Sequence, residues 1–356
     1  MVYVHVPFCR SFCTYCDFYS EIACKGKDVQ AIDSYVDCVC EEIQARREEI
    51  AASRPLNTLY IGGGTPSVLP PLSLIRIVDA FGDVWFDEFT MEVNPEDIVE
   101  KGSSYVASMK LAGVNRVSMG VQSLDDGMLR WMNRRHSADG ARSAFQTLRR
   151  AGMANISVDV IFGISHLTDE MLSATLDELI GWDPEHISAY QLSIEEGSAL
   201  AKMVEDGRYV EATEEQCRAQ YELICRKLSE AGYRHYEISN WAIPGYEAKH
   251  NSGYWKRVPY VGLGPGAHSF DGKKRSWNSQ ELSGWSSESE TLGVEEAREE
   301  SIMLGLRTAD GVEQSLLDPE KAKALISDGV VVEENGRLRI PEDHFFVSDA
   351  IISELV

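Results

Sequence analysis

The sequence predicts an α/β fold in which six strand–helix units build a parallel sheet, open or closed into a barrel, with a smaller α+β domain behind it. Three observations predict this fold. Short apolar, β-branched runs recur along the first part of the chain, and stretches with helical periodicity lie between most of them. The last part of the chain has a different pattern, in which two helical stretches flank a hairpin. Alternating strands and helices are typical of βαβ units, whose strands run parallel.

The runs expected to be strands lie at residues 2–6, 58–61, 89–93, 116–119, 156–161 and 186–193. The helices expected between them lie at residues 32–50, 72–81, 105–111, 141–151 and 170–180. In the first of these helices, Ile32, Tyr35, Val36, Val39 and Ile43 recur at helical spacing, and charged residues occupy the other face. In a barrel of such units, the chemistry is expected at the carboxyl ends of the strands.

The rest of the chain is expected to form two further units. Its expected elements are a helix at residues 205–231, a segment rich in aromatic residues and glycine at 233–278, a linker at 283–290 and a helix at 295–305. A hairpin that turns at Asn335-Gly336 and a closing helix complete a winged-helix-like pattern. We therefore expect three units: a barrel at residues 1–200, a helical insertion at 201–290 and a C-terminal α+β domain at 291–356.

The composition narrows the class of protein. The chain has 57 acidic and 34 basic side chains and a net charge of −23, which argues against a broad nucleic-acid-binding surface because such a surface needs clustered Lys and Arg. We expect neither a transmembrane segment nor a secretory signal, and hence a cytoplasmic protein without a disulfide framework. The cysteines that share no ligand spacing are expected to be ordinary thiols: Cys24, Cys38, Cys40, Cys217 and Cys225.

The remaining three cysteines lie in the stretch VHVPFCRSFCTYCDFYS, residues 4–20. Cys9, Cys13 and Cys16 have the spacing C-x3-C-x2-C, which suits neither a disulfide nor a four-ligand zinc site. Three thiolates can hold a [4Fe–4S] cluster and leave its fourth iron open for a ligand. A zinc site with His5 as the fourth ligand is the alternative, although no second Cys or His pair follows at finger-like spacing.

Polar and glycine residues at the expected strand ends are further site candidates. The stretch YIGGGTPS, residues 60–67, has three consecutive glycines that allow the backbone to approach a ligand closely. Glu92 ends one expected strand, and Gln122 follows the next. Asp159 lies between apolar strand residues, where a charge is costly unless it is paired, so an inward-facing position in a site is expected.

Taken together, these motifs resemble those of the radical S-adenosylmethionine (SAM) superfamily. The cysteine motif and the stretches YIGGGTPS, EVNPED, RVSMGVQS, NRRHS, DVIFG and GLRTADGV resemble the oxygen-independent coproporphyrinogen III oxidase family along nearly the whole chain. The resemblance implies a partial (β/α)6 radical SAM barrel. It also implies that Cys9, Cys13 and Cys16 ligate a [4Fe–4S] cluster whose open iron is chelated by SAM.

Two branches of this family are distinguished by one position and one motif. The oxidase has a further cysteine two residues after the third, where this chain has Phe18. The segment HNSGYW, residues 250–255, is similar to the H-N-x-x-Y-W motif of the heme chaperone branch. This resemblance implies binding of heme b and its transfer to respiratory or other hemoproteins. The alternatives are oxidative decarboxylation of coproporphyrinogen III, and a cluster that is only structural or redox-sensing.

The resemblance also implies roles for single residues. Positions that contact the cluster-bound SAM in the family are Tyr3, Tyr15, Gly63 and Glu92. Positions that contact a second SAM molecule in the oxidase are Gly64, Thr65, Gln122, Arg134 and Asp159. His250 is the candidate axial ligand of heme iron, and His268 is its competitor. The expected partners are SAM, heme and recipient hemoproteins, and a peripheral membrane contact is compatible with them.

Overall fold

The computed structural model describes residues 1–22, 28–53 and 55–356; the expected ordinary thiol of Cys24 lies outside them. All six expected strands are present as neighbours in one parallel sheet. They are β1 (Val2–Val6), β4 (Thr58–Gly63), β5 (Glu88–Val93), β6 (Arg116–Gln122), β7 (Ile156–Phe162) and β8 (His186–Gln191). The predicted α/β class is therefore confirmed.

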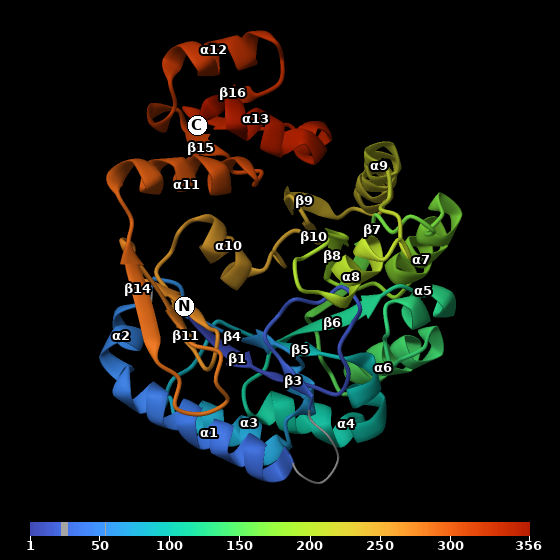
Figure 1. Ribbon diagram of the computed structural model, residues 1–356, viewed down its shortest axis with the longest axis vertical. Coiled ribbons are helices and arrows are strands. Elements are labelled where there is room, and N and C mark those ends of the chain that lie inside the picture. Colours follow the sequence, from blue (N-terminus) through green and yellow to red (C-terminus); the bar gives the residue numbers. More distant parts are fainter. Residues whose placement is uncertain (23–27, 54) are drawn as a thin grey trace.

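Helices cover the outer face of this sheet (Figure 1). They are α1 (Asp28–Ala45), α2 (Arg47–Ala52), α3 (Pro71–Asp79), α4 (Pro95–Leu111), α5 (Asp126–Trp131), α6 (Ala138–Arg150) and α7 (Asp169–Gly181). Their starts are encoded locally. The Ser137 and Thr168 side chains accept from backbone N–H groups in the first turns of α6 and α7, and Pro71 and Pro95 occupy first helical positions, where no N–H is needed.

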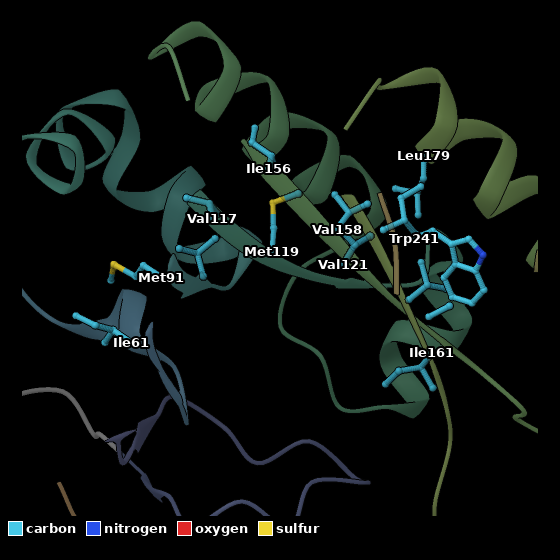
Figure 2. Close-up of a cluster of buried hydrophobic side chains, with 14 of the residues drawn as sticks. Ile61, Met91, Val117, Met119, Val121, Ile156, Val158, Ile161, Leu179 and Trp241 are labelled. Atoms are coloured by element: carbon cyan, nitrogen blue, oxygen red, sulfur yellow. The ribbon is translucent and has the colours of Figure 1, made fainter. Parts of the chain in front are cut away.

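Each strand divides its side chains between two environments. In β6, Val117, Met119 and Val121 are fully buried in the apolar cluster that lies under the helices, which Figure 2 shows. Ser118 and Arg116 alternate with them and belong to the opposite, inner face. The apolar face provides most of the stabilisation of the fold, and the inner face is left polar.

The sheet has nine strands and is open. Strands that the sequence did not predict extend it at both edges: β11 (Val261–Leu263) pairs in parallel with β1, while β10 (Asn240–Ala242) and β9 (Arg234–Glu237) follow β8 in antiparallel order. In the part of the chain that the structure describes, the end strands β11 and β9 do not pair, so the barrel is partial. These strands belong to residues 201–290, and the division into three units stays a prediction.

The prediction of a single helix at residues 205–231 is wrong. The structure has α8 (Ala199–Glu205) and α9 (Glu214–Glu230) instead. Gly207 takes a φ of 66° just after α8, a left-handed conformation that ends a helix at little cost. Thr213 then caps α9 by accepting from the Gln216 N–H.

The linker expected at residues 283–290 is also wrong. Residues Ser287–Thr291 form strand β14, which pairs with β13 (Lys274–Asn278), and β13 pairs with β12 (His268–Phe270). All residues of β14 are exposed, so the sequence has no apolar alternation to mark a strand. The Trp285 indole beside it donates to Glu42 over 3.0 Å, which attaches this small sheet to α1.

The C-terminal part has the expected winged-helix-like pattern and lies at the top of Figure 1. Its elements are α11 (Val294–Leu306), β15 (Val312–Glu313), α12 (Pro319–Ser327), β16 (Val332–Glu334), β17 (Arg337–Arg339) and α13 (Ser348–Leu355). Asn335 and Gly336 have φ values of 53° and 76°, as a two-residue hairpin turn requires. The fully buried Phe345 packs its ring 5.0 Å from that of His235 in β9. Among the described residues, no helix combines the length and apolar character needed to cross a membrane.

We predict that Trp241→Ala lowers the free energy of unfolding by about 3–5 kcal/mol, because a large buried side chain leaves a cavity. Trp241 is fully buried at one end of the apolar cluster (Figure 2) and stacks on His235 with ring centroids 4.1 Å apart. Urea denaturation followed by circular dichroism measures the change. Trp85→Ala is the control: Trp85 is 73% exposed, so its removal should change stability by less than about 0.5 kcal/mol. Equal effects of both changes would contradict the described core.

Candidate functional site

A cavity of about 570 Å³ lies at the carboxyl ends of the parallel strands. Strands β4 to β8 and the loop that follows β1 contribute its walls. The predicted site residues that line it are Cys9, Cys13, Tyr15, Cys16, Gly63, Gly64, Thr65, Glu92, Gln122, Arg134 and Asp159. Two other predicted residues, Tyr3 and His250, do not line it. The fold therefore brings together most of the residues that the sequence singled out.

The cysteine loop is attached to the barrel at several points. Strand β2 (Phe8–Cys9) pairs in parallel with β3 (Glu21–Ile22) and so closes the base of the loop. In the middle of the loop, the Thr14 N–H donates to the Met132 carbonyl over 3.1 Å, and the Leu200 N–H donates to the Thr14 carbonyl over 2.8 Å. These bonds hold the loop between α5 and α8, so that the three sulfurs face one cavity.

The surroundings of the thiols suit an iron–sulfur cluster. The Cys9 sulfur lies 3.4 Å from the Thr65 hydroxyl, and the Arg134 guanidinium donates to the Cys13 sulfur over 3.4 Å. Burial raises the pKa of the Cys9 thiol and raises that of Cys16 to about 11. Without a metal the Cys9 and Cys16 thiols therefore stay protonated, and binding of iron would release their protons. Soft thiolate ligands on short spacing are typical of iron–sulfur sites.

The alternative zinc site with His5 finds no support in the geometry. The two ring nitrogens of His5 lie 3.0 Å from the Tyr3 hydroxyl and 2.9 Å from the Tyr19 carbonyl, so both are engaged. Within residues 1–22, 28–53 and 55–356, no three His, Cys, Asp or Glu side chains are gathered tightly enough to hold a single ion. A four-iron cluster separates its sulfur ligands more widely than one ion does, and the sulfurs face a roomy cavity.

Three consecutive glycines, Gly62 and Gly63 at the end of β4 and Gly64 just after it, allow the chain to pass close to the cysteine loop. A Cβ atom on Gly64 would lie 2.8 Å from the Phe8 carbonyl oxygen and 3.1 Å from the Cys9 sulfur. A Cβ atom on Gly63 would lie 2.6 Å from the His5 ring, and the φ of Gly63 is 109°. The Gly64 N–H donates to the Val6 carbonyl over 2.8 Å. Larger residues here would push the cysteine loop away from the cavity.

Two carboxyl groups form an acidic floor. Glu92 accepts from the Tyr60 hydroxyl over 2.7 Å and from the Gly63 N–H over 3.1 Å. Burial raises the pKa of Glu92 to about 7, and the neighbouring Asp159 adds to the rise. Burial likewise raises the pKa of Asp159 to about 6, while the Ser118 hydroxyl donates to it over 3.2 Å. Such a floor favours a cationic ligand, which would hold the carboxyl groups ionised.

Among the described residues that line the cavity, two buried polar atoms have neither a hydrogen-bond partner nor an ion-pair partner. They are the amide oxygen of Gln122 and the Nε of Arg134, both on residues that line the cavity. Gln122 has a φ of 63° where the pairing of β6 with β7 is irregular. The other guanidinium nitrogens of Arg134 donate to Cys13, to the Asn94 side chain and to the Gly120 carbonyl. Buried polar groups without partners indicate that a ligand completes the site.

The two predicted residues outside the cavity lie deeper in the barrel. Tyr3 donates toward the His5 ring, and its own ring lies 6.1 Å from that of Tyr60. His250 is fully buried in α10 (Lys249–Trp255). Its ring nitrogens lie 2.8 Å from the Thr58 hydroxyl and 3.0 Å from the Tyr254 hydroxyl, and burial lowers its pKa to about 3. His250 therefore does not fit a heme iron in this conformation.

Sequence reasoning missed several polar residues that complete the site. Tyr60, Asn94, Ser118 and Tyr190 all line the cavity. A signal was present, because Tyr60 and Ser118 are polar residues at alternate positions of otherwise apolar strands. His268, the second heme-ligand candidate, is exposed in β12, with its ring 6.2 Å from that of Trp277.

Comparison with known proteins identifies the family. The model of the radical SAM superfamily matches residues 3–179. The heme chaperone HemW of Mycobacterium tuberculosis is 32% identical, over 100% of this chain and 94% of that protein. The heme chaperone HemW of Bacillus subtilis is 31% identical, over 91% of this chain and 87% of that protein.

A mitochondrial radical S-adenosyl methionine domain-containing protein 1 from Danio rerio is 32% identical, over 87% of this chain and 73% of that protein. Among solved structures, coproporphyrinogen III oxidase (HemN) of Escherichia coli matches with a TM-score of 0.80 at 18% identity, over 99% of this chain and 89% of that one. This likeness confirms the fold. The chain belongs to the radical SAM superfamily and, within it, to the family of HemW heme chaperones.

Proposed function

We propose that this protein is a heme chaperone that holds a [4Fe–4S] cluster, binds SAM beside it, takes up heme b and passes the heme to recipient hemoproteins. One observation carries the proposal. Three thiols line one cavity, and Phe18, at the position of the oxidase's further cysteine, lines the same cavity in a chain that is similar to HemW proteins over its full length.

The residues of the cavity have separate tasks in this proposal. Cys9, Cys13 and Cys16 would hold the cluster, which supplies an iron position for SAM when it is bound. Glu92 would attract the cationic part of SAM, because it is a carboxyl group in the acidic floor. Tyr15 and Gly63 line the wall beside it.

The other predicted SAM contacts differ in whether they line the cavity. Gly64, Thr65, Gln122, Arg134 and Asp159 line the cavity and remain candidates for contact with a second SAM molecule. Tyr3 would act through His5 rather than by direct contact, since its hydroxyl lies 3.0 Å from that ring.

Heme binding is proposed from the relatives and from the segment HNSGYW. The curated relatives are named heme chaperones. His250 and His268 stay the two candidate iron ligands. His250 would first have to give up its contacts with Thr58 and Tyr254, whereas His268 is exposed. We place the transfer in the cytoplasm, because cluster thiols need a reducing compartment.

A heme titration after anaerobic cluster reconstitution tests the proposed function. We expect one heme per chain, transfer of that heme to an apo-hemoprotein, and no carbon dioxide from coproporphyrinogen III. His250→Ala and His268→Ala, compared at equal cluster content, identify the ligand as the variant whose heme spectrum changes. A wild-type protein that takes up no heme would refute the proposal, and release of carbon dioxide would favour the oxidase.

Gly64→Ala should lower the iron bound after reconstitution by more than about half, because the new Cβ collides with the backbone of the cysteine loop. Iron analysis per chain measures the change. Gly181→Ala is the matched control, since, among the described residues outside its own helical turn, no atom lies within 4 Å of a Cβ at that position. Full iron content in Gly64→Ala would show that the close approach of β4 is not needed for the cluster.

The affinity for SAM should fall as the pH falls below about 7. The pKa of Glu92 is raised to about 7, so the carboxyl group takes up a proton there and loses the charge that attracts the ligand. The expected loss approaches about tenfold per pH unit. Glu92→Gln should bind SAM more weakly at pH 8 and lack this part of the pH dependence. Dividing the SAM dissociation constant of Glu92→Gln by that of the wild type at each pH removes the titration of SAM itself. A ratio that stays constant from pH 6 to 8 would contradict the prediction.

A further inference from the structure

Tyr60 lies between the cavity and helix α10. Its hydroxyl donates to Glu92 over 2.7 Å at the cavity floor. Its ring lies 5.2 Å from the His250 ring on the other side, with an angle of 35° between the ring planes. The phenol and the carboxyl group are closely packed, since a Cβ on Gly62 would come within 2.7 Å of the Tyr60 ring and 3.0 Å of the Glu92 carboxyl. One side chain thus contacts both regions.

Helix α10 is held by β4 and β5, two of the strands that build the cavity. The backbone N–H groups of Lys249 and His250 donate to the Glu88 carboxylate over 2.8 and 2.9 Å. The His250 ring contacts the hydroxyl of Thr58. Thr58 and Tyr60 share one face of β4, and Glu88 and Glu92 share one face of β5, because the side-chain period of a strand is two. The amino-terminal parts of these two strands therefore hold α10, and their carboxyl-terminal parts form the acidic floor of the cavity.

We propose that Tyr60 is a positioning residue. It couples ligand binding in the cavity to the position of α10, the helix that carries HNSGYW. The inference rests on the proposed function in one respect, namely that SAM is the ligand that fills the cavity. A cationic ligand beside Glu92 fixes the carboxylate, which fixes the phenol that donates to it. The phenol ring then holds the imidazole of His250 in its buried position. A ligand that favours one arrangement shifts the population of that arrangement.

Hydrogen exchange of the α10 backbone amides tests this coupling without requiring heme. In the cluster-loaded wild-type protein, saturating SAM should slow exchange of the Lys249 and His250 amides by about fivefold or more, a common size of coupling between sites. Tyr60→Phe keeps the ring and removes only the hydroxyl, so SAM should slow the same amides by less than about twofold.

Tyr233→Phe is the matched control. The Tyr233 hydroxyl is buried and donates to the Pro184 carbonyl over 2.6 Å, and neither residue lines the cavity. This variant should respond to SAM as the wild type does. A merely structural role of Tyr60 would change exchange equally with and without SAM, and would leave the ratio between the two conditions unaltered.

The SAM dissociation constant, measured on the same samples, separates the possible failures. If SAM binds and α10 exchange is unchanged in the wild type, or if Tyr60→Phe keeps the full response, the coupling is refuted and the proposed function stands. If SAM does not bind the cluster-loaded protein, both are refuted. As a second measurement, the affinity for heme with and without SAM should differ by about fivefold or more in the wild type and converge in Tyr60→Phe.

Discussion

The close approach of the glycines at the end of β4 to the cysteine loop is the constraint on which the site depends. Gly64 bonds to the end of β1 through its backbone, and its missing side chain leaves room for the Phe8 carbonyl and the Cys9 sulfur. The same stretch of chain presents Gly63 to the Glu92 carboxylate. One local conformation therefore sets the position of a thiol and of the acidic floor together, and side chains elsewhere in the cavity are placed relative to it.

The period of two along each strand separates stability from function. Apolar residues such as Val117 and Met119 face the helices and build the core, whereas Ser118 and Asp159 face the inside of the open barrel. The polar inner face continues below the cavity and reaches His250, which is fully buried among hydroxyl groups. This continuity provides a physical path between a cofactor site at the carboxyl ends of the strands and a helix at their amino ends.

Features that are encoded in a short stretch of sequence were predicted correctly. Features that depend on contacts between distant parts of the chain were not. All six parallel strands were predictable, because β-branched runs are visible in short windows, and the short spacing of the three cysteines predicted that they meet at one cavity. Strand β14 was not, since an exposed strand lacks the apolar alternation that marks strands. The burial of His250 depends on Thr58, a residue far away in the chain, and no short motif reports such a contact. Conversely, Asp159 was predicted because a carboxyl group inside an apolar run stands out.

The most direct test of this account is the electron paramagnetic resonance spectrum of the anaerobically reconstituted, reduced protein, recorded with and without SAM and combined with iron analysis. The account predicts about four irons per chain, as a cluster held by three thiolates requires, and a spectrum that SAM changes by binding at the open iron. A spectrum that is identical with and without SAM, or zinc in place of iron at Cys9, Cys13 and Cys16, would contradict it.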